Sequence, residues 1–168
     1  LNGKIRLENL VIDSSVDVTG SGVKFWNCRI NRQVQISGQN VEIQGCAITT
    51  NVTILASASN ILIRSCSIKK SGTLPYALEL AAARNIQVIG CEIVNSSGTA
   101  VRGPSSATGV PPLYHFSHNV IKGIFLAQND STFLLNHNII QGHLKFSAVY
   151  GGSVQYFANN VIIGTNSW

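Results

Sequence analysis

Eight segments of this 168-residue chain repeat one short pattern. Four of them place a cysteine three residues after an apolar residue and two residues before an isoleucine: FWNCRI, IQGCAI, IRSCSI and VIGCEI, at 25–30, 43–48, 63–68 and 88–93. Asparagine takes the cysteine position at 116–121, 135–140 and 156–161, and leucine takes it at 7–12. A period of 18 to 28 residues indicates that each repeat is one structural unit stacked on the next.

Apolar residues occupy the same places around the central position of every repeat. The central column is Leu10, Cys28, Cys46, Cys66, Cys91, Asn119, Asn138 and Asn159. Five residues before it stand Ile5, Val23, Val41, Ile61, Ile86, Tyr114, Phe133 and Val154. Three before stand Leu7, Phe25, Ile43, Ile63, Val88, Phe116, Leu135 and Tyr156, and two after stand Ile12, Ile30, Ile48, Ile68, Ile93, Ile121, Ile140 and Val161. Spacing by two on each side of a fixed break predicts two buried strands joined by a tight turn.

The turn is also visible in the residue that precedes the central column. It is Asn9, Asn27, Gly45, Ser65, Gly90, His118, His137 or Ala158. Glycine, asparagine and histidine tolerate left-handed backbone angles better than most residues, as a two-residue turn requires. Asn40, Asn60 and Asn85, each one residue before an expected strand, indicate a second corner of this kind.

Each repeat contains one more short apolar segment, which we expect to be a third strand. These segments are Val16–Val18, Val34–Ile36, Val52–Ile54, Leu78–Leu80, Ala100–Arg102, Ile124–Leu126 and Leu144–Phe146. Charged residues are only 11% of the chain, against about 25% in an ordinary soluble domain, which argues against exposed helices. The sequence therefore predicts an all-β, right-handed parallel β-helix of about eight coils with three short strands each, forming one domain over residues 1–168. We expect this chain to be a fragment of a longer one.

With this repeat, the sequence resembles the right-handed parallel β-helix proteins of the pectin lyase-like superfamily, which include polysaccharide lyases, polygalacturonases and phage tailspikes. The resemblance covers nearly the whole chain and is carried by the N-x-x-I-x-x-C/N-x-I pattern. It implies an inward ladder of asparagines at the turn between the second and third strands. Asn119, Asn138 and Asn159 fit that ladder, and cysteines replace it in the earlier coils.

The four cysteines allow three interpretations: disulfides, a zinc site, or free thiols buried as small hydrophobic side chains. A linear stack on consecutive coils does not offer the tetrahedral ligand set of zinc, so we expect free, stacked thiols and no metal or other cofactor. His118 and His137 share one turn position on adjacent coils, about 5 Å apart by the strand spacing. They could hold a metal or a sugar, although the turn itself accepts histidine and we favour that explanation.

The resemblance implies a substrate groove along the first-strand face. The outward residues there are predicted to be Asp17, Gln35, Thr53, Glu79, Val101, Phe125 and Lys145. Long insertions before and after these strands, at 69–77, 94–99 and 102–113, should wall the groove. We therefore predict a sugar-binding site lined by Tyr76, Glu79, Arg102, Phe125, His143 and Lys145.

Catalysis would need two convergent acids. Asp17 and Glu79 should lie three coils apart, about 14 Å, whereas glycoside hydrolases need about 5 to 9.5 Å. Only Glu79 and Asp130 remain as catalytic candidates, so we expect this segment to be non-catalytic. If it is an enzyme, it should be a polysaccharide depolymerase, either a lyase or a hydrolase.

The net charge of +5 is scattered, which argues against a nucleic-acid surface, and no apolar run reaches the ~20 residues of a membrane span. Our first hypothesis is a segment of a phage tailspike or tail fibre, located in the virion or outside the cell, that recognises bacterial surface polysaccharide. We expect a homotrimer, since Trp26, Leu62, Ile89, Leu134 and Phe157 should form an outward apolar stripe on the second strands. The alternatives are a polysaccharide lyase or glycoside hydrolase and a structural or adhesion β-helix.

Overall fold

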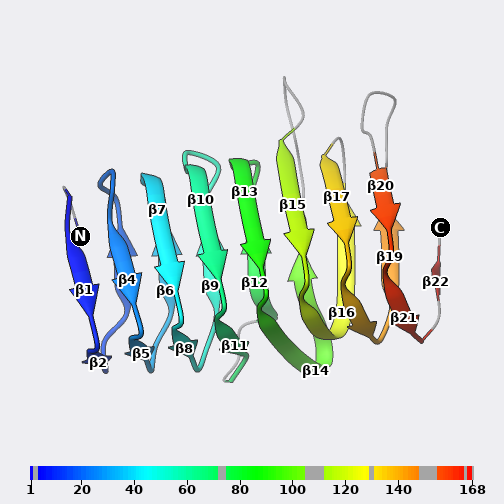
Figure 1. Ribbon diagram of the computed structural model, residues 1–168, viewed down its shortest axis with the longest axis horizontal. Coiled ribbons are helices and arrows are strands. Elements are labelled where there is room, and N and C mark those ends of the chain that lie inside the picture. Colours follow the sequence, from blue (N-terminus) through cyan, green and yellow to red (C-terminus); the bar gives the residue numbers. More distant parts are fainter. Residues whose placement is uncertain are drawn as a thin grey trace.

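The computed structural model is a parallel β-solenoid in which the chain advances along the long axis from one coil to the next (Figure 1). It describes residues 1, 4–71, 75–104, 112–128, 131–147, 155–164 and 166–167. Sheet A, the strands before the tight turn, has eight parallel strands: β1 (Arg6–Glu8), β4 (Lys24–Trp26), β7 (Gln39–Gln44), β10 (Ser59–Arg64), β13 (Arg84–Ile89), β15 (Leu113–Ser117), β17 (Thr132–Asn136) and β20 (Gln155–Ala158). They correspond to about seven complete turns, close to the eight predicted coils.

Sheet B has 14 strands and contains both other strands of each coil. The strands that follow the tight turn are β2 (Val11–Ile12), β5 (Arg29–Ile30), β8 (Ala47–Ile48), β11 (Ser67–Lys69), β18 (Ile139–Gln141) and β21 (Val161–Ile163). Those that precede sheet A of the next coil are β3 (Val16–Val18), β6 (Val34–Ile36), β9 (Val52–Ile54), β12 (Tyr76–Leu80), β19 (Leu144–Ser147) and β22 (Asn166–Ser167). In the middle of the chain, β14 (Glu92–Arg102) and β16 (Val120–Gln128) each span both positions.

These two long strands correct the prediction of three short strands in every coil. The stretch 94–99, expected to be an insertion beside the groove, is part of β14 and contains register shifts against β16. In β14 and β16, the alternation of inward and outward side chains is also shifted by one residue from the predicted alternation. Arg102 and Leu126 take the outward positions assigned to Val101 and Phe125, because a one-residue slip in a strand turns each side chain to the opposite face.

The predicted apolar columns form the core. Phe25, Ile43, Ile63, Val88 and Phe116 lie on successive rungs of sheet A and are fully buried. The prediction is wrong by one residue in the last coil, where Phe157, Asn160 and Ile162 align with the columns in place of Tyr156, Asn159 and Val161. Phe157 therefore faces Phe146, with ring centroids 5.3 Å apart, and does not belong to the outward stripe.

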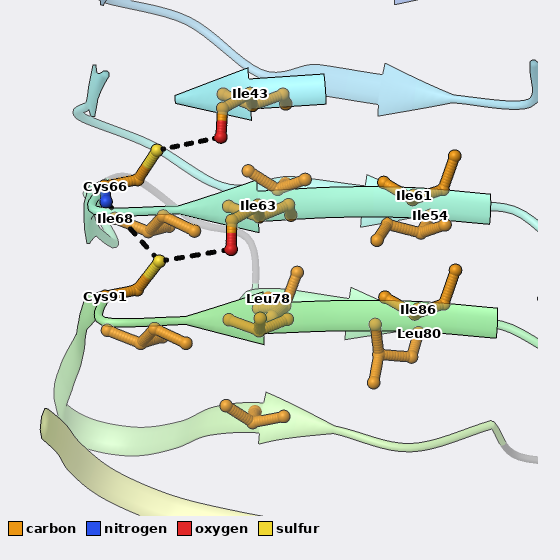
Figure 2. Packing of buried hydrophobic residues seen from close by; sticks show 14 of the residues in the cluster. Ile43, Ile54, Ile61, Ile63, Cys66, Ile68, Leu78, Leu80, Ile86 and Cys91 are labelled. Atoms are coloured by element: carbon orange, nitrogen blue, oxygen red, sulfur yellow. Dashed lines mark hydrogen bonds between the residues drawn. The ribbon is translucent and has the colours of Figure 1, made fainter. Parts of the chain in front are cut away.

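The central column is a hydrogen-bonded ladder between coils (Figure 2). The backbone N–H of Cys66 donates to Cys91 Sγ at 3.4 Å, and the Cys91 thiol donates to the carbonyl of Ile63 at 3.6 Å. The thiol of Cys66 sits in the same way on the coil before it, accepting from the N–H of Cys46 and donating to Ile43. All four thiols are free and buried, as predicted, but they are hydrogen-bonding groups as well as space-filling ones.

Asparagine continues this ladder with shorter hydrogen bonds. Asn119 Oδ1 accepts from the N–H of Cys91 at 2.8 Å, and Asn119 Nδ2 donates to the carbonyl of Val88 at 2.9 Å. The next two rungs add amide-to-amide bonds, from Asn119 to Asn138 and from Asn138 to Asn160. The turn before the ladder has positive φ at every coil, at Asn9, Asn27, Gly45, Ser65, Gly90, His118, His137 and Asn159.

Cys66→Ala should test the ladder. Alanine leaves the buried N–H of Cys46 and the carbonyl of Ile43 without that partner, so we expect a loss of about 1–3 kcal/mol in unfolding free energy. Cys66→Ser keeps a donor and an acceptor and should lose less. Chemical denaturation measures both, with Ser67→Ala as the control on the outer side of the same turn, expected to change stability by less than about 0.5 kcal/mol. A serine variant less stable than the alanine variant would contradict the hydrogen-bonding role.

A second column, of glycines, begins inside β16 and continues at the corners of the next two coils. Gly123 (φ +127°), Gly142 (φ +148°) and Gly164 (φ +154°) have backbone angles that L side chains rarely adopt. A Cβ on Gly142 would lie 2.2 Å from the carbonyl oxygen of Gly123, and one on Gly123 would lie 2.3 Å from that of Asn95. The coils approach so closely here that each needs a residue without a side chain.

Gly142→Ala should therefore be more destabilising than Gly90→Ala. Gly90 has a left-handed φ of +63°, but a Cβ added there would lie 3.9 Å from its nearest neighbour, Ser65 Oγ. We therefore expect Gly90→Ala to cost only the conformational free energy of about 1–2 kcal/mol. Alanine at residue 142 also collides with backbone, which adds about 1–3 kcal/mol. Thermal unfolding of the two variants checks the order, and equal losses would show that the close approach carries no strain.

Candidate functional site

The predicted groove face is the outer side of sheet B, where one outward residue from each coil forms a row parallel to the solenoid axis. In register, this outer row is Asp17, Gln35, Thr53, Glu79, Arg102, Leu126 and Lys145. The row is positioned by parallel strands whose opposite faces pack in the core, so its side chains are presented at a fixed spacing of about 4.8 Å.

Arg102 is the centre of a cluster on this row. Its Nη1 lies 3.3 Å from Glu79 Oε1, and its Nε donates to Gln128 Oε1 at 3.1 Å. The guanidinium also lies over the Tyr76 ring, 4.6 Å from the centroid, which is within the range of a cation–π interaction. The two charged side chains are only partly exposed, 24% for Arg102 and 33% for Glu79. Three of the predicted site residues, Tyr76, Glu79 and Arg102, are therefore brought together.

Lys145 lies two rungs further along the outer row, with Leu126 between it and Arg102. Within the described part of the chain its ammonium has no ion-pair partner within 4 Å, whereas Arg102 is paired. The row therefore presents, in sequence, an ion pair beside an aromatic ring, an apolar side chain and a cation.

Phe125 was predicted to be a stacking platform, and that prediction is wrong. Its side chain is 0% exposed and packs inside the solenoid against Phe116 and Phe133, at centroid distances of 5.1 and 5.5 Å. Tyr114, whose hydroxyl donates to the carbonyl of Ala81 at 2.7 Å, completes this aromatic core. The aromatic residues of these coils thus support the sheet beneath the outer row and do not line the groove.

Of the two catalytic candidates, only Glu79 lies among the described residues. Asp17 and Glu79 are three rungs apart, as predicted, and the nearest charged neighbour of Glu79 is Arg102. Asp130, together with 72–74 and 105–111 of the predicted groove walls, lies outside the described residues. What the described cluster offers chemically is hydrogen bonding and charge pairing.

His143 lies at the edge of the row, two residues before Lys145. Its backbone carbonyl accepts from the N–H of Phe125 at 2.8 Å, which fixes it beside β16. The residue lines a pocket of about 390 Å³ formed where the glycine column bends sheet B. His143 immediately precedes β19, and the pocket that it lines depends on the glycines and on the merged strands, which the repeat pattern did not indicate.

His118 and His137 stack on the outside of the tight turn, with ring centroids 5.0 Å apart and planes 6° from parallel. The spacing agrees with the prediction, and both residues have the left-handed φ of that turn. Across the described ranges, no three histidine, cysteine, aspartate or glutamate side chains group together in a way that could hold a metal ion. The left-handed φ of the turn is a sufficient reason for histidine at both positions.

Leu126 and Gln128 are the functional-face residues that sequence analysis missed. Both follow from the corrected register of β16, in which Leu126 and Gln128 alternate with the buried Phe125 and Ala127. The signal that could have located them is Gly123, because an extra glycine inside an apolar run marks a bend at which the strand pattern changes phase.

The described residues contain no helix that is long and apolar enough to cross a membrane. A family model described as the right-handed β-helix region matches residues 8–162. Searches of curated proteins and of solved structures found no match to this chain. The match spans nearly every coil and agrees with the parallel solenoid and its inward ladder, so the chain belongs to the right-handed β-helix family.

Proposed function

We propose that this chain is a β-helix segment of a phage tailspike or tail fibre that binds bacterial surface polysaccharide along the outer row of sheet B. The observation that carries the proposal is the Arg102 cluster. Its guanidinium is fixed by Glu79, Gln128 and the Tyr76 ring, so a polar site is organised before any ligand arrives. Prearranged polar groups beside an aromatic ring suit recognition of sugar hydroxyls.

The geometry of the row favours an extended ligand over a compact one. Rungs repeat at about 4.8 Å along a straight axis, and a linear glycan lying parallel to that axis would meet a new side chain at each step. Leu126 supplies an apolar surface for a sugar methyl or acetyl group, and Lys145 supplies a charge for an acidic group. These features favour an acidic capsule or lipopolysaccharide chain over a neutral one.

The proposal is for binding without cleavage. The Glu79 carboxylate is paired with Arg102, and Asp17 is three rungs away, beyond the separation at which two carboxylates cooperate in glycoside hydrolysis. A lyase or hydrolase activity remains the alternative function. It would appear as new chain ends in a polysaccharide incubated with the protein.

Affinity electrophoresis through gels containing alginate, hyaluronan or dextran tests the proposed site. We expect retardation by at least one of the two acidic polymers and little by dextran. Replacing both Arg102 and Lys145 with alanine should weaken the interaction about tenfold, with a larger effect at low salt because screening is then least. Incubation should not shorten the polymers.

The control for this experiment is Arg32→Ala combined with Lys4→Ala, which removes the same charge from exposed positions in the first two coils, away from Arg102 and Lys145. It should leave retardation unchanged. Equal weakening by both double variants would show that only net charge matters and would contradict a specific site. Cleavage of the polymer, abolished by Glu79→Gln, would replace the proposal by the enzymatic alternative.

We further propose that the segment works as a homotrimer with part of sheet A at the interface. Leu62, Ile89 and Leu134 are half-buried on its outer face, while Lys24, Glu42 and Arg64 form an ion-paired group on the same face. The apolar residues are thus separated by charged ones, and a trimer contact here would be mixed in character.

Sedimentation velocity measures this directly. We expect a species of three times the 18.0 kDa chain mass, and replacement of Leu62 and Leu134 by glutamate should shift it to the monomer because charge is then buried at the contact. Replacement of the outer-row Thr53 by glutamate is the control and should leave the trimer intact. A stable monomer of the unmodified protein would remove the trimer from the proposal.

A further inference from the structure

The pocket at the glycine bend has a chemistry distinct from that of the outer row. It holds about 390 Å³ and lies where the third strand of one coil continues into the first strand without a corner loop. Backbone of the glycine column forms part of its wall, and its polar lining residues are Ser96, Ser97, Lys122, Gln141 and His143. No carboxylate is among the described residues that line it.

The charge beside the pocket is positive. Glu92 is contacted by two cations, Lys122 at 2.8 Å and Lys69 at 3.2 Å, so the three side chains together carry one net positive charge. Hydrogen bonding to Lys122 and then to Lys69 holds the pKa of Glu92 below its ordinary value, so this carboxylate is ionised at neutral pH. Of the three, Lys122 lines the pocket, and its side chain is 42% exposed.

Neutral hydrogen-bonding groups surround this charge. The Ser97 hydroxyl donates to Asn95 Oδ1 at 3.2 Å, which leaves its oxygen as an acceptor. Gln141 pairs in register with Lys122 and presents an exposed side-chain amide. A cation together with an amide and a hydroxyl matches a sugar that has both hydroxyls and a carboxylate, and the volume is in the range of small-ligand sites.

The pocket also adjoins the proposed groove. Ile124 and His143 line it, and each lies two residues before an outer-row residue, Leu126 and Lys145 respectively. A glycan lying on the row at these coils could therefore place a side group in the pocket.

We propose that the pocket is a subsite for a uronic acid residue, with the sugar carboxylate directed at Lys122 and the ring hydroxyls at Ser97 and Gln141. This inference rests on the proposed function, because it assigns the acidic component of the glycan that the outer row would bind. Lys122, at the bend of sheet B, would then be a second position that recognises an acidic group, in addition to Lys145 on the outer row.

Titration of the ¹⁵N-labelled protein with glucuronic acid, methyl glucoside and acetate tests the subsite by NMR. Glucuronic acid should shift the backbone resonances of Ser97, Gly123 and Gln141. Methyl glucoside and acetate at the same concentration should not, since the first lacks the charge and the second lacks the ring. Equal shifts with acetate would identify a general anion site and overturn the inference.

The decisive variant is Gln141→Glu, which places a carboxylate next to Lys122 on the neighbouring rung. Glucuronic acid affinity should fall at least fivefold. Gln39→Glu makes the same change at an exposed position of sheet A, outside both the pocket and the outer row, and should have no effect. Unchanged affinity in Gln141→Glu would overturn the subsite.

Affinity electrophoresis of the same variants separates this inference from the proposed function. Wild-type retention of acidic polysaccharide by Gln141→Glu, together with wild-type glucuronic acid binding, would remove the subsite and leave the groove. Glucuronic acid binding without retention by any polysaccharide would refute the proposed function and support the pocket as a site for the free acid.

Discussion

Every coil of this solenoid depends on one hydrogen-bonded contact with the coil before it. The ladder residue accepts a hydrogen bond from a backbone N–H of the preceding coil and donates one to a nearby carbonyl of that coil. The N–H belongs to the ladder residue of the preceding coil and is buried at the tight turn, whereas the carbonyl belongs to a strand residue of sheet A. Leaving that buried N–H unpaired would cost about 1–3 kcal/mol, which favours a side chain that can accept a hydrogen bond at this position.

The same contact explains why so much of the fold could be predicted. Two strands and a turn are fixed around the ladder, so Ile43 and Ile63 recur at constant offsets and both are buried. The spacing between the third strand and the next coil is not fixed in this way. There the pattern was assigned one residue out of phase, and Phe125 was placed outside although it packs against Phe116 and Phe133. Its phase depends on the bend at Gly123, a close contact between coils that the sequence marks only by a glycine inside an apolar run.

The candidate site was predicted in part for a related reason. Glu79 and Arg102 were both expected to line the groove, but their ion pair was not predicted, because Val101 had been assigned the outward position beside Glu79. The hydrogen bond to Gln128 was not predicted either, since it needs the register of β16 and the direction of a long side chain. The pocket beside Lys122 and His143 arises from backbone geometry over three coils, and no residue in it forms a recognisable motif.

The change from thiol to amide along the ladder gives the molecule two halves that can be observed separately. All four cysteines of the chain lie between residues 28 and 91, and the later coils carry asparagine at the same position. A buried thiol reacts with an alkylating reagent only when its coil opens, so the rate of alkylation reports local opening of the earlier coils and is blind to the later ones. Because the coils of a solenoid contact only their neighbours, the rate of alkylation would show whether unfolding begins at the end that carries the cysteines or at the end that carries the asparagines.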